Sequence, residues 1–432
     1  MKTNQPGNYR WIVCALLFFA TTVNYLDRQI IGLLKPILAE KFHWSEIDYK
    51  NIVQAFQACY AIGLLVFGRV VDKIGTKMGY IASIIIWSVS AMAHALVRTT
   101  LGFGIVRGAL GLGESGNFPT AIKVVAEWFP KKERATATGI FNSGANIGAV
   151  VAPILVPFIL GIYGWQMAFI ITGAIGFVWL VFWIIFYEIP SKQKRLSAAE
   201  YELIHSDIDE VAVNAADEKQ IGWGQLLKYR QTWFFIFGKL LTDPVWWFFL
   251  FWLPSYFAST FNLDLTKPSL PLVIVYSAST VGSVGGGYLS SWFIKRGWPV
   301  FKARKIAMLL FAICVVPIVA AKYAVGIWQA VALISLAVAA HQAWSANIFT
   351  TASDMFPKRA ISSVVGIGSM AGALGGFLFP DFIGYILQTN KDAGHILVGY
   401  NIIFATCGGA YLLAWVVMHF LAPKMKPVNL AD

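Results

Sequence analysis

The chain is poor in charged residues. Only 13% of its 432 residues are Asp, Glu, Lys or Arg, whereas 57% are hydrophobic, and this composition lies well outside the range of ordinary soluble domains. Cysteine is also scarce. The four cysteines stand singly without a metal-binding spacing, so we interpret them as packing residues: Cys14, Cys59, Cys314 and Cys407.

No arrangement typical of an enzyme is visible either. The sequence shows no nucleophile with a neighbouring base, no set of metal ligands and no polar segment long enough for a catalytic domain. The pattern from Gly111 to Gly116 (GLGESG) matches a dinucleotide-binding motif, but it lies inside a long apolar run with no strand before it. We therefore expect no enzymatic activity, no cofactor and no metal, and we interpret these glycines as a close-packing feature.

Long hydrophobic runs make up most of the chain. Most of them reach the roughly 20 residues that a helix needs to cross the ~30 Å core of a bilayer. Such spans are helices, because an open backbone polar group is too costly in lipid. The sequence predicts an all-α membrane protein with twelve transmembrane helices, near residues 11–34, 50–71, 78–98, 101–128, 135–160, 165–187, 231–257, 269–293, 304–322, 327–350, 361–388 and 396–421.

The basic residues predict the orientation. Lys and Arg outnumber Asp and Glu, 34 to 22. With both termini in the cytoplasm, 23 of the 34 basic residues fall on the cytoplasmic side, 7 on the other side and 4 within the spans, as the positive-inside rule requires. This bias accounts for the net charge of +12, so we expect no nucleic-acid partner. The first span lacks a convincing cleavage site and is expected to be retained.

An internal repeat divides the chain. Residues 127–153 (EWFPKKERATATGIFNSGANIGAVVAP) align without a gap with residues 354–380 (DMFPKRAISSVVGIGSMAGALGGFLFP). Two six-helix halves in parallel repeat follow from this alignment. We expect an N-terminal half over 1–188, a cytoplasmic linker with a short surface helix over 189–230, and a C-terminal half with its tail over 231–432.

Charged side chains inside the predicted spans indicate where function lies, because each costs about 2.5 to 3.5 kcal/mol on insertion scales. Glu114, which shares a helix face with Arg107 seven residues before it, is the first candidate for carrying a proton. Asp27, beside Arg28, is either the second candidate or a packing residue. With one carboxylate protonated, the buried bases exceed the acids by two charges, which favours an anionic ligand: Arg28, Arg107, Lys123 and Lys239 against Asp27, Glu114 and Asp243.

Several of these residues have a structural alternative. Arg107 and Glu114 can form an ion pair that only joins helices. Lys239 and Asp243, four residues apart, suit a salt bridge within one helix. His341, which the repeat places at the position equivalent to Glu114, is either a satisfied core histidine or a second site residue.

The chain resembles the major facilitator superfamily over nearly its whole length, through its two six-helix halves and the charged turn after the second helix. The anion:cation symporter branch is indicated by Asn24-Tyr25-Leu26-Asp27-Arg28, by Arg107, Glu114 and Phe118-Pro119, and by Trp128-Phe129-Pro130 before Glu133-Arg134. Within it, bacterial hexuronate transporters are most similar, through Gly75-Thr76-Lys77, WQMAFI at 165–170, Lys239 with Asp243-Pro244, and His341-Gln342-Ala343.

The resemblance implies a proton-coupled secondary active symporter that imports a hexuronate, glucuronate or galacturonate, by alternating access. The alternatives are an organic-anion or organophosphate exchanger of the same fold and a sugar-acid (aldonate) symporter. We expect a monomer in the lipid bilayer of the bacterial cytoplasmic membrane. The resemblance and the side-chain chemistry together indicate substrate-binding residues Tyr25, Arg28, Tyr60, Lys239, Gln342 and Ser369, proton-coupling residues Asp27, Glu114 and Arg107, and a conformational latch of Arg69 and Asp72.

Overall fold

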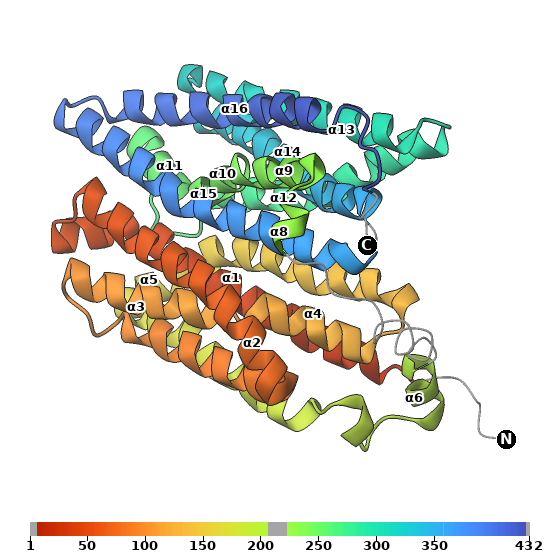
Figure 1. Ribbon diagram of the computed structural model, residues 1–432. Coiled ribbons are helices and arrows are strands. Elements are labelled where there is room, and N and C mark those ends of the chain that lie inside the picture. The colour runs from red at the N-terminus through yellow and green to blue at the C-terminus, as the bar shows by residue number, and fades with distance from the viewer. Residues whose placement is uncertain (1–6, 206–222, 357, 429–432) are drawn as a thin grey trace. The chain divides into compact units, whose positions relative to one another are not determined.

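The computed structural model describes residues 7–205, 223–356 and 358–428. Within these ranges every regular element is a helix, and nine helical stretches are long and apolar enough to cross a membrane. The predicted all-α membrane class is therefore confirmed. In order (Figure 1), the elements are α1 (Tyr9–Phe42), α2 (Glu46–Ala93), α3 (Thr100–Glu114), α4 (Asn117–Trp128), α5 (Lys131–Phe186), η1 (Pro190–Lys192), α6 (Ala198–His205), α8 (Trp223–Leu226), α9 (Arg230–Leu240), α10 (Asp243–Phe251), α11 (Leu253–Phe261), α12 (Leu270–Lys295), α13 (Val300–Val315), η2 (Val316–Tyr323), α14 (Ile327–Met355), α15 (Lys358–Asp392) and α16 (Ile396–Leu421).

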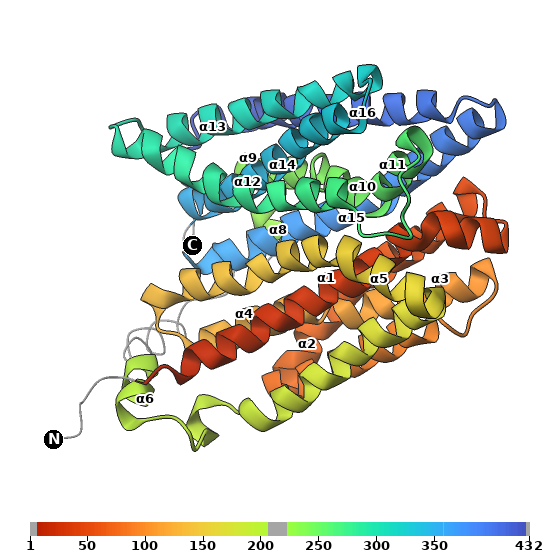
Figure 2. The ribbon, with the colours of Figure 1, turned by 180° about the vertical axis from the view of Figure 1, so that it is seen from behind.

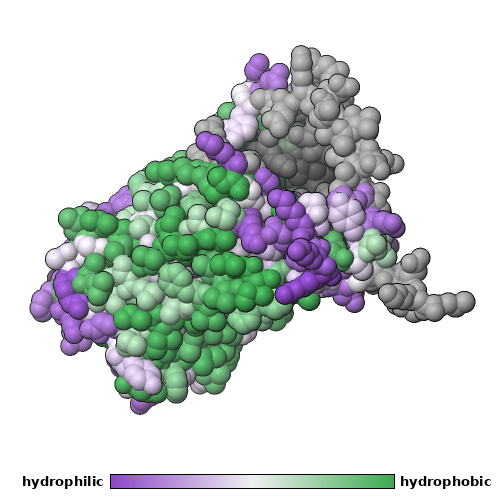
Figure 3. Space-filling view, turned by 90° about the horizontal axis from the view of Figure 1, so that it is seen from below, coloured by the Kyte–Doolittle hydropathy of each residue, from purple (hydrophilic) through white to green (hydrophobic). Residues whose placement is uncertain are grey.

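The chain forms two compact units. Unit 1 contains Met1–Ile31 and Ala55–Lys219, and unit 2 contains Gly32–Gln54 and Gln220–Asp432. In unit 2, α13 packs between α14 and α16 in the blue-green part of the ribbon (Figures 1 and 2). On the face shown in Figure 3, hydrophobic side chains cover the middle and hydrophilic ones gather at the ends. This distribution suits a surface that crosses a bilayer.

Two of the long elements each combine two predicted spans. Helix α2 contains Gly75 with φ 82° and ψ 164°, and α5 contains Gly164 with φ 83° and ψ 173°. A positive φ is tolerated by glycine because it has no Cβ. The predicted spans 50–71 and 78–98 therefore meet near Gly75, and the spans 135–160 and 165–187 meet at Gly164.

Two other predicted spans are interrupted. The span 101–128 consists of α3 and α4, and the span 231–257 consists of α9, α10 and the start of α11. Pro244 and Pro254 lie in the first turns of α10 and α11, where the missing N–H of proline costs no helical hydrogen bond. The apolar pattern alone did not reveal these interruptions, since hydrophobicity continues through them.

The short helix in the expected linker is tied to the start of α1. Ser197 caps α6 by accepting the N–H of Glu200 at 3.2 Å. Ser197-Ala-Ala-Glu200 has the sequence of a capping box, in which the Glu200 carboxylate would accept the backbone N–H of Ser197. This carboxylate accepts the backbone N–H groups of Tyr9 and Arg10 at 3.1 and 3.0 Å instead and pairs with the Arg10 guanidinium at 3.0 Å. A carboxylate at these open N–H groups stabilises the first turn of α1.

The turn that follows the second predicted span is anchored by its own motif residues. Thr76 donates to Glu127 Oε2 at 2.9 Å, and the Tyr187 hydroxyl donates to the same oxygen at 3.0 Å. Lys77 donates to Glu188 Oε2 at 2.8 Å, and this hydrogen bond lowers the pKa of the Glu188 carboxyl. The side chains of the predicted latch, Arg69 and Asp72, lie outside the described side chains, so the latch stays a prediction.

The residues between the first two spans belong to unit 2. Tyr49 donates its hydroxyl to the Phe251 carbonyl oxygen of α10 at 2.7 Å. Lys50 forms an ion pair with Asp381 of α15 at 2.7 Å, and Gln54 donates to the other oxygen of the same carboxylate at 2.7 Å. A segment of the first sequence repeat is thus held by helices of the second.

Helix α12 packs on α14 through glycines. A Cβ on Gly282 would lie 2.0 Å from the Ala339 carbonyl oxygen, whereas a Cβ on Gly285 would meet no atom within 4 Å. We expect Gly282→Ala to lower the free energy of unfolding by about 1 to 3 kcal/mol, because the two backbones must separate. Gly285→Ala is the matched control and should leave stability unchanged or raise it. Thermal unfolding of both purified variants in detergent tests this, and equal melting temperatures would contradict it.

Candidate functional site

The helix break between α3 and α4 positions the first group of buried charges. Ser83 Oγ donates to the Gly113 carbonyl oxygen at 2.7 Å, and Asn24 Nδ2 donates to that of Glu114 at 3.4 Å. The Gly113 carbonyl oxygen also accepts the backbone N–H of Gly116 at 3.3 Å, so side-chain donors supplement the backbone hydrogen bonds at the break, as backbone at membrane depth requires. Cβ atoms on Gly111 and Gly113 would lie 2.4 and 2.5 Å from neighbouring backbone atoms, which supports the close-packing interpretation of this motif.

Glu114, the last residue of α3, forms its ion pair with Arg28 of α1. Arg28 Nε and Glu114 Oε2 are 2.7 Å apart, and both side chains are at most 1% exposed. Arg28 Nη2 also donates to Asn24 Oδ1 at 3.1 Å. The guanidinium carbon lies 4.6 Å from the ring centre of Tyr25 and 4.8 Å from that of Tyr60. Four residues from the predicted list therefore meet at one point: Tyr25, Arg28, Tyr60 and Glu114.

Arg107 is not the ion-pair partner that its position in the sequence suggested. Its Nη2 donates to the Arg28 carbonyl oxygen at 2.5 Å, and its guanidinium carbon lies 4.7 Å from the Phe56 ring centre. Seven residues correspond to about 10.5 Å of helix rise, so sharing a face with Glu114 does not bring the two charges into contact. Arg107 instead fixes the backbone of the residue that carries the pairing guanidinium.

Asp27 is buried beside this pair at 1% exposure. Among the residues that the structure describes, neither of its carboxylate oxygens has a hydrogen-bond partner. The neighbouring Thr172 hydroxyl donates to the Ala168 carbonyl oxygen at 2.9 Å. Glu114 Oε1 likewise has no partner within the described part of the chain. Buried acceptors without a hydrogen-bond partner are uncommon in folded proteins and need an explanation.

A second group of charges lies in unit 2, at the break between α9 and α10. Lys239 Nζ and Asp243 Oδ2 are 2.8 Å apart, with side chains 7% and 20% exposed. The ammonium also lies 4.5 Å from the ring centre of Phe349 in α14. A Cβ on Gly372 of α15 would lie 2.2 Å from the Asp243 carboxylate, so this glycine makes room for the pair. Gln342 and Ser369 belong to the same unit and are half-buried.

Sequence reasoning missed several residues that complete these groups. Asn24 and Phe56 contact Arg28, and Tyr411 contacts His341. Asn24 was visible as a polar residue inside a span. The two aromatic residues carried no signal, because they lie among many aromatic residues in apolar helices.

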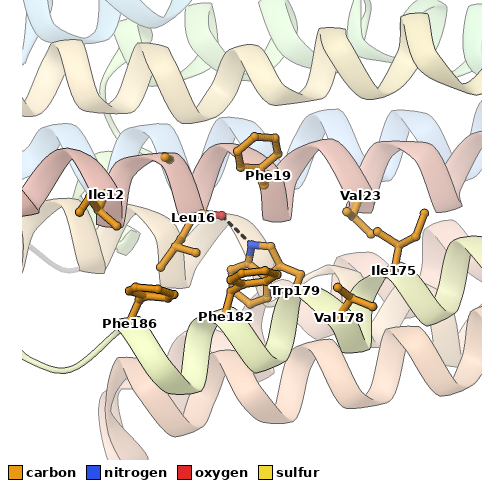
Figure 4. Close-up of a pocket in the computed structure, with 10 residues that line it drawn as sticks. Ile12, Leu16, Phe19, Val23, Ile175, Val178, Trp179, Phe182 and Phe186 are labelled. Atoms are coloured by element: carbon orange, nitrogen blue, oxygen red, sulfur yellow. Dashed lines mark hydrogen bonds between the residues drawn. The ribbon is translucent and has the colours of Figure 1, made fainter.

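The apolar groove of unit 1 shown in Figure 4 is not suited to an anion. It has a volume of about 510 Å³ and lies between the first half of α1 and the last part of α5. Trp179 contributes an indole N–H, but this group already donates to the Leu16 carbonyl oxygen at 2.9 Å (Figure 4). The described residues also contain no group of three or more His, Cys, Asp or Glu side chains that could hold a metal ion.

A membrane-spanning helical protein with ionisable groups at its helix breaks is typical of secondary transporters. Residues 17–380 match the model of the Major Facilitator Superfamily. The chain is 32% identical to the hexuronate transporter of Escherichia coli (strain K12) over 427 residues, 98% of this chain and 96% of that protein. It is 36% identical to the galacturonate transporter of Dickeya chrysanthemi over 286 residues, 66% of this chain and 83% of that protein.

The crystal structure of the D-xylose-proton symporter is similar in fold, with a TM-score of 0.73 at 16% identity, covering 98% of this chain and 100% of that one. The chain belongs to the major facilitator superfamily, as its motifs suggested. It is a multi-pass membrane transporter and not an enzyme.

Proposed function

We propose that the protein is a proton-coupled symporter that imports a hexuronate, glucuronate or galacturonate. The observation that carries the proposal is the buried Arg28–Glu114 pair, held 2.7 Å apart between tyrosine rings at a helix break. The functions named for the two curated relatives support the substrate class. A bacterial cytoplasmic membrane with both termini in the cytoplasm is the corresponding location.

Competition for Arg28 provides the coupling. Its planar guanidinium can bind both oxygens of a carboxylate, and Glu114 occupies one of its edges. When Glu114 takes up a proton, the neutral carboxyl no longer holds the guanidinium as an ion, and Arg28 becomes available to the carboxylate of the substrate. Proton and substrate then favour each other's binding, which is the linkage that symport requires.

Asp27 gives the proton a second site. It is buried in the same unit and interacts electrostatically with both Glu114 and Arg107. Two neighbouring carboxylates in one low-dielectric region do not both ionise readily. We therefore propose that Glu114 carries the coupled proton and that Asp27 assists it.

Lys239 is the proposed cation of the C-terminal half for the same substrate. Its ammonium forms an ion pair with Asp243, and as a point charge it can also hold a hydroxyl or carboxylate oxygen. An organophosphate exchanger remains the alternative, because paired cations also bind phosphate. An aldonate symporter is favoured if the open-chain form of the substrate binds better than the ring.

Replacing Lys239 tests this role. We expect Lys239→Gln to reduce hexuronate uptake by about tenfold, since a charged hydrogen bond of about 1.5 kcal/mol is lost, while the melting temperature changes little. Asp243→Asn is the matched control. If both variants lose stability and transport together, and the double variant recovers both, the pair is a structural salt bridge and the substrate role of Lys239 is wrong.

Uptake into proteoliposomes decides among the functions. Labelled glucuronate, galacturonate and glycerol phosphate are offered with an imposed pH gradient, inside alkaline. We expect both hexuronates to accumulate above their outside concentration and a protonophore to abolish this accumulation. Exchange of glycerol phosphate without dependence on the gradient would replace the proposal with the organophosphate alternative.

A further inference from the structure

His341 belongs to a polar chain that links three helices of unit 2. It lies in α14 and is 3% exposed. Its Nδ1 contacts the Tyr411 hydroxyl of α16, and its ring stacks on Trp246 of α10 with centroids 5.3 Å apart and planes within 2°. The Tyr411 hydroxyl also reaches the Thr242 carbonyl oxygen at 3.3 Å, in the break between α9 and α10.

The contact between His341 and Tyr411 allows either direction, depending on the tautomer. We assign the single hydroxyl proton of Tyr411 to the Thr242 carbonyl oxygen, which can only accept. The oxygen of Tyr411 is then an acceptor toward His341, and Nδ1 of His341 carries the proton. In the neutral imidazole the other nitrogen, Nε2, is consequently an acceptor. No hydrogen bond within the described residues uses Nε2 of His341.

We propose that His341 is a specificity-determining residue whose Nε2 accepts a hydrogen bond from a ring hydroxyl of the transported sugar acid. Tyr411 is the positioning residue that holds the required tautomer. The proposal rests on the proposed function and deepens it. Two further observations support it: the sequence repeat places His341 at the position equivalent to Glu114, and its hydrogen-bonded chain ends at the break that also separates Lys239 from Asp243.

A second histidine in the spans provides an internal comparison. His94, the residue after α2, contacts the backbone carbonyl oxygen of Ser90 through Nδ1 at 2.7 Å, and like His341 it stacks on an aromatic ring, that of Phe169, with centroids 4.8 Å apart. It is 0% exposed, however, and it lies in the turn that joins α2 to α3, whereas the hydrogen bonds of His341 lead to the break between α9 and α10. We expect His94 to be a packing residue, which makes it the matched control.

The test compares binding of intact and deoxygenated substrates. His341→Phe keeps a ring on Trp246 and removes both nitrogens, so the fold is expected to persist. Affinity for the hexuronate should fall about tenfold, as expected when a hydroxyl is left without its acceptor. The monodeoxy hexuronate that lacks the hydroxyl bound by His341 should bind wild type about tenfold more weakly than the intact hexuronate does. The same analogue should bind His341→Phe and wild type with equal affinity, within about twofold. His94→Phe should leave all these affinities unchanged.

Tyr411→Phe tests the tautomer. In ¹⁵N-histidine-labelled wild type we expect the His341 signals of a protonated Nδ1 and an unprotonated Nε2, and in Tyr411→Phe a mixture of both tautomers with a two- to fourfold loss of hexuronate affinity. A protonated Nε2 in wild type overturns the proposal.

The two proposals fail in different ways. If wild type does not bind or transport hexuronates, the proposed function is wrong and the role of His341 falls with it. If wild type transports them, and every monodeoxy analogue loses the same factor in wild type and in His341→Phe, the proposed function stands and His341 is only a core residue.

Discussion

Glu114→Gln should abolish the accumulation of hexuronate driven by a pH gradient, while substrate counterflow persists. Glutamine keeps the shape of the protonated acid and can still accept from Arg28, now 2.7 Å away, but it cannot release a proton. Without proton uptake and release at this position, the imposed pH gradient can no longer drive the accumulation of substrate. In proteoliposomes we expect the ratio of inside to outside substrate to fall to one, and counterflow to lose the pH dependence that we expect of wild type.

A matched control separates this effect from the loss of any ion pair. Glu133 also pairs with an arginine, Arg10 at 2.8 Å, but its side chain is 25% exposed and it lies in the first turn of α5. We expect Glu133→Gln to accumulate substrate as wild type does. A Glu114→Gln protein with wild-type accumulation would refute the assignment, and loss of accumulation in Asp27→Asn alone would transfer the role to Asp27.

Arg28→Ala should weaken hexuronate binding by about 1.5 to 3 kcal/mol, the range for a hydrogen bond to a charged group, which is roughly 10- to 150-fold in the dissociation constant. Arg28→Lys should restore only part of this loss, because a point charge replaces a planar fork. Removing one member of a buried pair also destabilises the fold. We therefore measure binding in a Glu114→Gln background, where the partner carries no charge.

Arg98 is a suitable control for Arg28. It belongs to the same unit and donates to the backbone carbonyl oxygens of Ala95 and Val97 at 2.7 and 2.8 Å. Arg98→Lys should leave the substrate-induced rise in melting temperature unchanged, whereas Arg28→Ala should remove most of that rise. Equal substrate-induced stabilisation in Arg28→Ala and wild type would exclude Arg28 from the binding site.

Much of the candidate site was predictable because charges are conspicuous in apolar spans. Asp27, Arg28, Arg107 and Glu114 were each visible as an ionisable residue that hydrocarbon would not tolerate without a role. Their pairing was not predictable. Spacing along one helix suggested Arg107 as the ion-pair partner of Glu114, but Arg28 from another helix forms the pair. The packing of the two helices decides which side chain of the second helix lies beside Glu114.

The polar chain from His341 to Thr242 shows the same limit in unit 2. The sequence marks His341 as an unusual residue and repeat counterpart of Glu114. It gives no reason to single out Tyr411 among the aromatic residues, and it cannot show that the Thr242 carbonyl lies in a helix break, because α9, α10 and α11 read as one apolar run.

The sequence by itself determined the all-helical membrane class, the superfamily and the ionisable residues of interest, since each follows from hydrophobic length, repeat or motif within one segment. Only the tertiary structure decided where the helices break, which guanidinium pairs with Glu114, and that Gly32–Gln54 packs with the helices of the second repeat. The physical reason is that these features depend on contacts between segments distant in sequence. A hydrophobic pattern records that a residue is buried in lipid or protein, but it does not record the neighbour against which the residue is buried.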